Sequence, residues 1–203
     1  MECSFIASGL GYRAKTEKEP EEYNTVRSIN MLGFFYPSTP AEMIGSWNMR
    51  TQYWLKYYVM VRQLDRTKPR KSGTNTKPIF ITFLVAAAWH GFNFGFYGCA
   101  FTLMMMDLMW KFMSPTKLAH TISSLLPALL DRVLKVILMQ MILSYSVISL
   151  NFLLFETSFK AYSEIYFFWH FFMVFVMLAA MLLPKATGKA AAKTKPESVK
   201  KTQ

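Results

Sequence analysis

An uncharged and strongly apolar run constrains this chain more than any other feature. No Asp, Glu, Lys or Arg lies between Lys77 and Asp107. The centre of the run, residues 80–97 (FITFLVAAAWHGFNFGFY), contains one imidazole, that of His90. Such a run belongs in a lipid bilayer or in a large core, where a titratable ring is costly unless it has a partner or a function. We therefore interpret His90 as a candidate functional residue, together with Asn48 of the nearest upstream polar cluster.

The charged residues gather outside the apolar runs. Hydrophobic residues make up 53% of the chain and charged residues 17%, and the charges concentrate in the first thirty residues, in residues 62–77 and after Leu183. This distribution is typical of an integral membrane protein. The net charge of the chain is +11. A strongly positive net charge is also typical of nucleic-acid-binding proteins. Here the basic residues flank apolar spans, where positive charge sets topology and faces anionic lipid, so we expect membrane lipids and no nucleic acid as partners.

Two stretches toward the C-terminus each predict a membrane-crossing helix. Residues 136–155 and residues 165–183 contain no Asp, Glu, Lys or Arg, and each is close to the roughly 20 residues that cross the hydrocarbon. We expect a surface helix over residues 122–130 to lead into the first crossing. His170, early in the second, is interpreted as an interior polar contact. With the stretch at residues 79–110, the fold class is all-α: a polytopic transmembrane protein of about four membrane helices plus interfacial helices.

Residues 79–110 are too long for one straight crossing, because a continuous helix of this length would measure about 48 Å. Gly91, Asn93 and Gly95 interrupt the stretch. We predict a helix up to about His90, a break, and a second helix from about residue 96. Unwound backbone at membrane depth is tolerated only where protein or a cavity satisfies it, so the break predicts a cavity beside His90. One crossing, two crossings and a re-entrant V remain open.

Upstream of this stretch, two local patterns predict helices. Thr39, with Glu42 three residues later, forms a capping box at a helix start. Residues 47–62 (WNMRTQYWLKYYVMVR) predict a helix in the membrane interface, since Trp and Tyr favour the headgroup zone. Asn48, Gln52 and Lys56 recur every four residues and are expected to line one face of that helix.

The remaining segments predict loops. Residues 1–30 are polar and mixed in charge, and residues 63–77 are basic and linker-like. The basic residues in or beside the second loop either set topology or attract the phosphates of CoA: Arg62, Arg66, Lys68, Arg70 and Lys71. Residues 185–203 predict a disordered, cytoplasmic tail that ends in Lys200-Lys201-Thr202-Gln203. This ending matches a dilysine signal for the endoplasmic reticulum, with a chance pair of lysines as the alternative.

Cysteine and histidine do not predict a metal or disulfide site. Cys3 and Cys99 give no disulfide framework, and Cys99 is expected to be a buried, inert thiol. The three histidines are scattered and no CxxC motif is present, so no metal is expected. Residues 104–106, three consecutive methionines, are interpreted as lipid-facing or packing residues.

Two motifs together resemble those of a known family. The first is Ser46-Trp47-Asn48-Met49-Arg50-Thr51-Gln52-Tyr53-Trp54-Leu55-Lys56, and the second is Ala88-Trp89-His90-Gly91-Phe92 followed by Gly95-Phe96-Tyr97. Their order, spacing and apolar setting resemble the signature of the membrane-bound O-acyltransferases, in the lysophospholipid acyltransferase branch. The resemblance covers about residues 1–184. Members of that family are about twice this length, so it implies that these residues form the C-terminal part of the acyltransferase domain.

The resemblance implies a many-helix membrane fold around a chamber. Acyl-CoA enters the chamber from the cytosol as co-substrate, the lysophospholipid enters from the bilayer, and no further cofactor is required. By residue-by-residue correspondence His90 and Asn48 are expected to be catalytic. The residues expected to bind substrate are Trp47, Trp54, Lys56, Trp89 and Tyr97. The implied location is the endoplasmic reticulum membrane, with several spans and a cytoplasmic C-terminus.

The implied reaction transfers a fatty acyl group from a thioester to a lysophospholipid hydroxyl. A neutral imidazole is the usual base near pH 7, and burial favours the neutral form, so His90 is the expected general base. Asn48 would orient the hydroxyl or donate a hydrogen bond to the thioester carbonyl. The alternative is a catalytically inactive scaffold subunit of related fold, or a fragment of a gene product, with other membrane proteins as partners.

Overall fold

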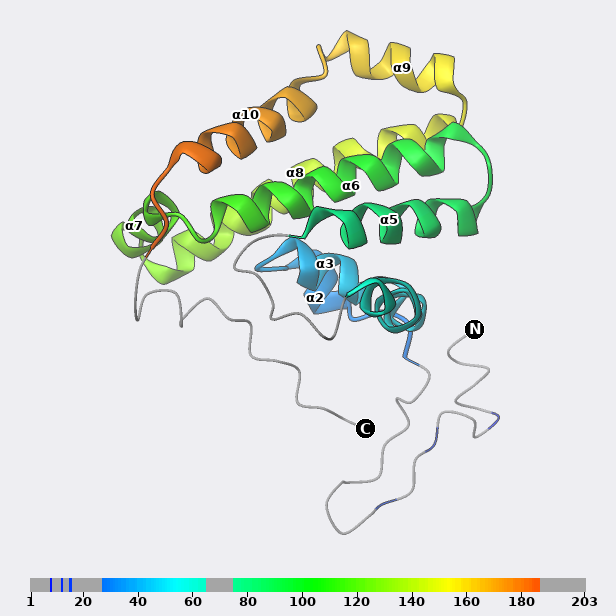
Figure 1. Ribbon diagram of the computed structural model, residues 1–203, viewed down its shortest axis with the longest axis horizontal. Helices are drawn as coiled ribbons and strands as arrows, with labels where there is room; N and C mark the ends of the chain where they lie inside the picture. Colours follow the sequence, from blue (N-terminus) through cyan, green and yellow to red (C-terminus); the bar gives the residue numbers. More distant parts are fainter. Residues whose placement is uncertain (1–7, 9–11, 13–14, 16–26, 65–74, 187–203) are drawn as a thin grey trace.

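The computed structural model describes residues 8, 12, 15, 27–64 and 75–186. Within these residues the chain forms helices and no strand, apart from an isolated antiparallel bridge between Thr116 and Lys185. Figure 1 labels most of the elements. They are α2 (Met31–Phe35), α3 (Pro40–Ser46), α4 (Met49–Trp54), the π-helix η1 (Leu55–Met60), the 3₁₀ turn η2 (Val61–Gln63), α5 (Thr76–His90), α6 (Phe94–Met113), α7 (Lys117–Leu125), α8 (Ala128–Phe152), α9 (Phe155–Glu164) and α10 (Phe168–Leu182). Most of the predicted N-terminal and basic loops, and the predicted disordered tail from residue 187 on, lie outside the described residues.

The first described helices start as the capping pattern predicts. The backbone N–H of Glu42 donates to Thr39 Oγ1 at 3.1 Å, and the backbone N–H of Ser38 donates to Glu42 Oε2 at 2.7 Å. Farther along the chain, Gln140 Nε2 donates to the carbonyl oxygen of Phe34 at 3.0 Å, which ties the end of α2 to α8.

The predicted break beside His90 is confirmed. α5 ends at His90 and α6 begins at Phe94. The N–H of Gly91 donates to the carbonyl oxygen of Ala88 at 3.2 Å, and Gly91 has a φ of 132°, which side chains disfavour. Figure 1 shows the chain turning back here, so that α5 and α6 lie side by side. The stretch is therefore a reversed helix pair and not one straight crossing.

Helix α6 lies at the centre of the molecule, packed against α5, α8 and α10. Small residues bring α6 and α8 close together. A Cβ atom on Gly95 would lie 2.2 Å from the carbonyl oxygen of Ser149 and 2.8 Å from Cα of Leu153, and one on Gly98 would lie 3.0 Å from Cβ of Ser149. Close approach at small residues is typical of helix pairs in membranes, where packing replaces the hydrophobic effect as the main driving force.

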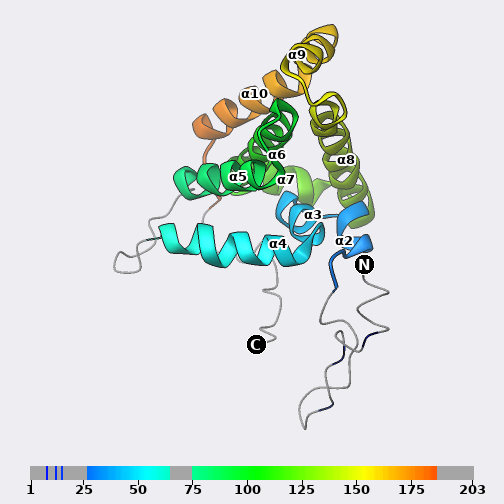
Figure 2. The same ribbon diagram turned by 90° about the vertical axis from the view of Figure 1, so that its right-hand side faces the viewer.

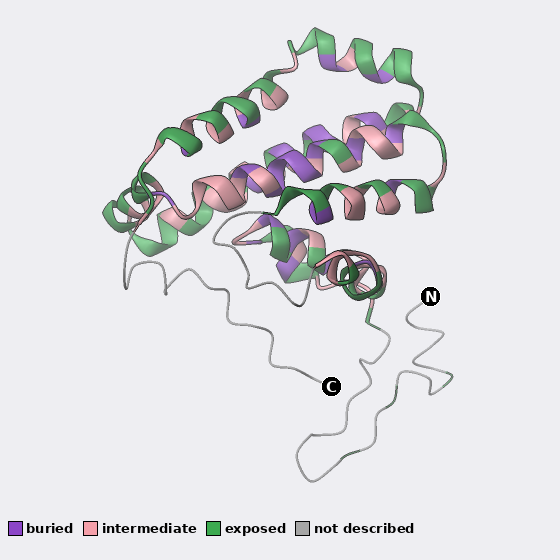
Figure 3. Cartoon of the chain, in the orientation of Figure 1, coloured by how far each residue is buried: buried purple, intermediate pink, exposed green. Residues whose placement is uncertain are grey.

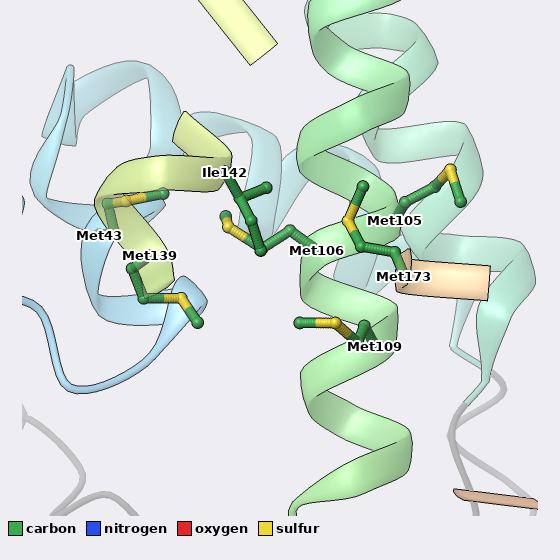
Figure 4. Close-up of a cluster of buried hydrophobic side chains, with 7 residues drawn as sticks. All are labelled: Met43, Met105, Met106, Met109, Met139, Ile142 and Met173. Atoms are coloured by element: carbon green, nitrogen blue, oxygen red, sulfur yellow. The ribbon is translucent and has the colours of Figure 1, made fainter. Parts of the chain in front are cut away.

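The core around α6 is built mainly from methionine. Its largest cluster joins α3, α6, α8 and α10 and consists of Met43, Met105, Met106, Met109, Met139, Ile142 and Met173 (Figure 4). Figure 3 shows the buried residues concentrated along α6 and α8, with more exposed helices around them. Residues 104–106 are all buried, so these methionines pack in the interior and do not face lipid. Flexible methionine side chains fill the irregular space between the crossing helices.

One predicted crossing corresponds to a helix of suitable length and apolarity, and the other is wrong in extent. α8, with 25 residues, is long and apolar enough to cross a membrane, although it ends at Phe152, before the predicted end. Residues 165–183 do not form one helix. α10 has only 15 residues, about 22 Å, and it bends by 73° from α9 at a break where Tyr166 and Phe167 have positive φ. By length and composition, the described residues supply one crossing, or two if the bent α9–α10 pair counts as one.

The predicted surface helix over residues 122–130 is also corrected. α7 ends at Leu125 and α8 begins at Ala128, so residues 122–130 contain the end of one helix and the start of another. Pro127 explains the division, because proline disfavours helical geometry in the residue before it and Leu126 is extended (φ −91°, ψ 142°).

Candidate active site

The two sequence motifs occupy neighbouring helices. The asparagine motif covers the end of α3, all of α4 and the start of η1. The histidine motif covers the end of α5 and the start of α6, and η1 packs against α5. The ends nearest the connecting loop meet at a cavity lined by Tyr58, Val59 and Gln63 on one side and Asn75, Lys77, Pro78 and Ile81 on the other. Asn48 and His90 lie at the opposite ends of their helices. Figure 2 shows the continuous helix formed by α4 and η1 below α5. Figure 1 shows the same helix nearly end-on, so it crosses α5.

Asn48 occupies the junction between α3 and α4. Its backbone is left-handed (φ 46°, ψ 55°), a conformation that asparagine tolerates better than most residues. The N–H of Gln52 donates to the carbonyl oxygen of Asn48 at 3.0 Å, and the N–H of Met49 donates to that of Ser28 at 2.7 Å. The Asn48 side chain is half-buried and does not cap α4. Its amide is therefore held at a fixed bend and is free to bind another group.

His90 is the last residue of α5 and lies among aromatic rings. Its ring stacks on Phe96, with centroids 5.4 Å apart and planes 20° apart, and contacts Trp89 edge to face at 4.8 Å. Within the described residues its ring nitrogens form no hydrogen bond, and the side chain is exposed. The expectation that His90 is buried is therefore wrong for this structure. The Phe96 stack holds the plane of this exposed ring.

The structure brings the two motifs onto packed elements without joining their polar groups. No hydrogen bond links Asn48 to His90 among the described residues. The cavity at the start of α5 includes neither His90 nor Asn48, so it is not the cavity predicted beside the break. The proposal that these two residues act as one site therefore rests on their motifs and on the packing of their helices.

The helix after Asn48 changes from α to π geometry at Leu55. A π segment has more residues per turn than an α-helix. The α-helical spacing that would align Asn48, Gln52 and Lys56 on one face therefore ends at Trp54. Aromatic pairs accompany the change: Trp54 stacks on Tyr58 at 6.4 Å, and Lys56 Nζ lies 5.4 Å from the ring centre of Tyr57. π segments are frequent at functional sites, and nothing in the sequence pattern signalled this one.

The other residues predicted to bind substrate lie apart from one another. Trp47 packs on Phe34 with ring centroids 5.1 Å apart, and Trp89 lies next to His90. Trp47, Trp54, Lys56 and Trp89 are exposed, and Tyr97 on α6 is half-buried. Trp89 therefore lies with His90 at the end of α5, and Trp54 and Lys56 lie on the helix formed by α4 and η1. No hydrogen bond or ring contact links these two pairs among the described residues.

A second polar cluster lies in the interior. His170 on α10 pairs through Nδ1 with the hydroxyl of Tyr145 on α8, at 2.5 Å, and through Nε2 with Thr102 Oγ1 on α6, at 3.1 Å. Thr102 Oγ1 also donates to the carbonyl oxygen of Gly98 at 2.9 Å. One tautomer satisfies every group: Tyr145 donates to Nδ1, and Nε2–H donates to Thr102. The interior contact predicted for His170 is confirmed.

The partners of His170 were not predicted, because Tyr145 and Thr102 lie on other helices and no local pattern connects them. A cavity of about 330 Å³ adjoins the cluster. Its lining is almost wholly aromatic and aliphatic: Phe94, Gly98, Phe101, Met105, Phe159, Tyr162, Phe167, His170, Phe171 and Val174. His170 therefore links α6, α8 and α10 through hydrogen bonds at both of its ring nitrogens.

Comparison with known proteins places the two motifs in a family. The sequence model of the membrane-bound O-acyltransferase family matches residues 1–148, a range that contains both Asn48 and His90. The chain belongs to the membrane-bound O-acyltransferase family. Members of this family are membrane proteins, in agreement with the apolar helix α8.

Several curated members of the family are similar to the chain. It is 28% identical over 172 residues to "Lysophospholipid acyltransferase" of Schizosaccharomyces pombe, which is 81% of this chain and 33% of the relative. It is 36% identical over 97 residues to "Lysophospholipid acyltransferase" of Saccharomyces cerevisiae, 47% of this chain and 15% of the relative. Human "Membrane-bound glycerophospholipid O-acyltransferase 2" is 25% identical over 164 residues, 81% of this chain and 29% of the relative. The chain thus spans about a third or less of the length of these relatives, a smaller share than the half expected from the motifs.

Proposed function

We propose that the chain carries the catalytic motifs of a lysophospholipid acyltransferase, which transfers an acyl group from acyl-CoA to a lysophospholipid hydroxyl. The observation that carries this proposal is the presence of both family motifs, with Asn48 and His90, on helices that pack together. The printed names of the relatives support the substrate class.

The proposed chemistry uses His90 as general base. The lysophospholipid hydroxyl oxygen attacks the thioester carbonyl carbon, and the hydroxyl proton moves to an unprotonated nitrogen of His90. The tetrahedral intermediate collapses, the carbon–sulfur bond breaks, and CoA leaves as a thiol after taking the proton from the imidazolium. The amide N–H of Asn48 donates to the carbonyl oxygen as it becomes negative. No acyl-enzyme is needed, and Cys99 is buried beside Ser146.

The exposed ring of His90 is compatible with this role, because a base must reach the substrate hydroxyl. The Phe96 stack limits rotation of the ring, and Gly91 allows the chain to turn away immediately after it. A closed chamber around the thioester would need contacts beyond those of the described residues. Trp47, Trp54 and Trp89, all exposed, supply aromatic surface for lipid in such a chamber.

The cavity of about 490 Å³ at the start of α5 is a candidate site for the polar part of acyl-CoA. Lys77 lines it, Arg62 precedes Gln63 of its wall, and the Oε1 atom of Gln63 is buried without a partner among the described residues. The Lys77 cation suits a phosphate group, and the Gln63 Oε1 acceptor suits an N–H or O–H donor of the same ligand. We place the protein in the endoplasmic reticulum membrane with its C-terminus in the cytoplasm, on the basis of its basic C-terminal residues.

A non-catalytic scaffold is the second candidate. It is favoured by the exposed, unbonded ring of His90 and by the absence of a hydrogen bond between His90 and Asn48 among the described residues. The scaffold needs the fold and its partners but not these two side chains.

Replacement of His90 separates the two candidates. In the full gene product, His90→Ala should lower the rate of acyl transfer from acyl-CoA to lysophospholipid by about 100-fold or more, which is the usual contribution of a general base. His120→Ala, on α7 outside both motifs, is the matched control and should keep the wild-type rate. A His90→Ala protein with wild-type activity would remove the proposed chemical role, and a wild-type protein without activity would support the scaffold.

A further inference from the structure

Helix α7 presents its apolar side chains outward. Leu118, Ile122 and Leu125 follow the i, i+4, i+7 spacing of one helix face, and they are 43%, 46% and 76% exposed. His120 and Ser123 lie on the opposite face and are half-buried. A helix on the surface of a water-soluble protein shows the reverse pattern, with its apolar face on the core. The surroundings of α7 are therefore apolar on its outer side.

Hydrogen bonds fix the orientation of α7. Ser123 Oγ donates to Asp131 Oδ1 of α8 at 3.0 Å, and Lys135 Nζ donates to Ser123 Oγ at 3.2 Å and to Asp131 Oδ2 at 2.5 Å. At the other end of the helix, the N–H of Lys117 donates to the carbonyl oxygen of Pro184 at 2.8 Å. Rotating α7 so that Leu118, Ile122 and Leu125 faced the core would break these hydrogen bonds. The fold therefore holds this apolar face outward.

The position of α7 in the fold places it at a membrane surface. α8, the helix long and apolar enough to cross, begins at Ala128, just after α7 ends at Leu125. In Figure 1 α7 is seen nearly end-on beside the end of α8, and in Figure 2 it lies across the direction of α8. Leu129, 76% exposed, extends the apolar strip onto α8. An amphipathic helix that lies across the end of a membrane span belongs in the interface plane.

Positive charge surrounds the apolar strip. Lys117, Arg132 and Lys185 are exposed, and among the described residues none of them forms an ion pair. The antiparallel bridge between Thr116 and Lys185 holds Lys185 beside the start of α7. Asp131, the nearby carboxylate, is already paired with Lys135. Three unpaired cations around an exposed apolar strip are complementary to anionic phospholipid headgroups above acyl chains.

We propose that α7 and Leu129 form an interfacial anchor that binds the anionic leaflet of the bilayer. Leu118, Ile122 and Leu125 insert at the boundary between headgroups and acyl chains, and Lys117, Arg132 and Lys185 contact lipid phosphates. The anchor does not depend on the proposed acyl transfer. It commits this end of the molecule to the leaflet that carries anionic lipid.

A photo-crosslinker identifies what covers α7. The full gene product is prepared with benzoylphenylalanine at Ile122 and placed in phosphatidylcholine vesicles that contain phosphatidylserine. Irradiation should attach phospholipid to α7, as detected by peptide mass spectrometry. The matched control places the probe at His120, on the inward face and outside the Ser123–Asp131–Lys135 hydrogen bonds, which should crosslink to peptides of the same chain. Attachment of Ile122 mainly to a protein segment, of this protein or of another, would overturn the anchor.

Charge removal tests the headgroup preference independently of activity. Native mass spectrometry gives the ratio of phosphatidylserine to phosphatidylcholine retained by the protein. We expect the wild-type protein to enrich the anionic lipid, and each of Lys117→Gln, Arg132→Gln and Lys185→Gln to lower that enrichment by up to about fivefold. Lys160→Gln, on α9 at the other end of α8, should leave it unchanged. Equal ratios for the wild-type protein and the triple variant would overturn the assignment to anionic lipid.

Discussion

His170 shows how a single polar residue is accommodated in an apolar interior. Its ring receives a hydrogen bond from Tyr145 and donates one to Thr102, so three helices are joined through one side chain. His90, by contrast, has aromatic neighbours and no hydrogen-bond partner among the described residues. His170 thus has a packing role in this structure, and the case for His90 as the candidate base depends on its place in the family motif.

The network around His170 should contribute measurably to stability. Tyr145→Phe removes the hydroxyl that donates to Nδ1 and leaves that nitrogen unpaired, so we expect a loss of about 1 kcal/mol in the free energy of unfolding. The measurement is the apparent melting temperature of the purified protein in detergent.

Tyr53→Phe is the matched control for this variant. Tyr53 is exposed, its ring centroid lies 4.3 Å from that of Tyr57 with the planes tilted by 42°, and its hydroxyl has no hydrogen-bond partner among the described residues. It should leave the melting temperature unchanged. An equal effect of both substitutions would show that the Tyr145 hydrogen bond is not what stabilises the bundle.

At the scale of single residues the sequence predicted types of environment better than partners. His170 was expected to make an interior polar contact, which is correct, but Tyr145 and Thr102 lie on other helices and could not be named. The burial expected for His90 is wrong, because apolar neighbours in sequence do not establish that a side chain is enclosed. The left-handed backbone of Asn48 has no Gly or Pro beside it and gave no local signal.

At the scale of elements, the α6–α8 contact depends on two glycines, Gly95 and Gly98, that differ in how much space they leave for a side chain. A Cβ on Gly95 would lie 2.2 Å from a backbone oxygen, whereas a Cβ on Gly98 would lie 3.0 Å from the side chain of Ser149. A clash with backbone can be relieved only by moving a helix, and a clash with a side chain is relieved by a small shift.

Alanine substitution should therefore separate these positions. Gly95→Ala is expected to destabilise the protein by about 1–3 kcal/mol or more, the cost of overpacking, and Gly98→Ala by clearly less. The measurement is the melting temperature together with the yield of folded, monodisperse protein. Gly45→Ala, with no atom within 4 Å of the added Cβ, should be neutral. If Gly95→Ala were as stable as Gly45→Ala, the close approach of α6 and α8 would be refuted.

The start and end signals of several helices were readable in the sequence, and others were not. The capping box at Thr39 and the break after His90 depend on local chemistry, so both were predicted correctly. The bend between α9 and α10 falls at Tyr166 and Phe167, two aromatic residues without Gly or Pro, inside a run of uniform apolarity. Hydropathy alone cannot distinguish such a bent pair from one straight crossing.

For the whole molecule, the charge distribution predicts an orientation in the membrane. The cations Lys111, Lys117, Arg132, Lys135 and Lys185 lie on or beside the last turn of α6, the start of α7, the first turns of α8 and the end of α10. By the positive-inside tendency we expect this end to face the cytoplasm, and α9, at the opposite end of α8, to face the other side of the membrane.

Labelling of single cysteines checks this orientation. In a Cys3→Ser background, Lys117→Cys should react with a membrane-impermeant maleimide added to sealed microsomes, whose outer face is cytoplasmic. Lys160→Cys on α9 should react only after detergent opens the vesicles. Cys99, which is buried, provides the low background. The reverse labelling pattern would contradict the proposed orientation.

The central claim is that Asn48 and His90 act as one site, and a double-mutant cycle tests it most directly. The rate of acyl transfer from acyl-CoA to lysophospholipid is measured for the gene product, for Asn48→Ala, for His90→Ala and for the double variant. Residues that act on one transition state are not additive, so we predict that the double variant is about as slow as the slower single variant. A double variant slowed by the product of the two single effects, or a single variant that keeps the wild-type rate, would contradict the account.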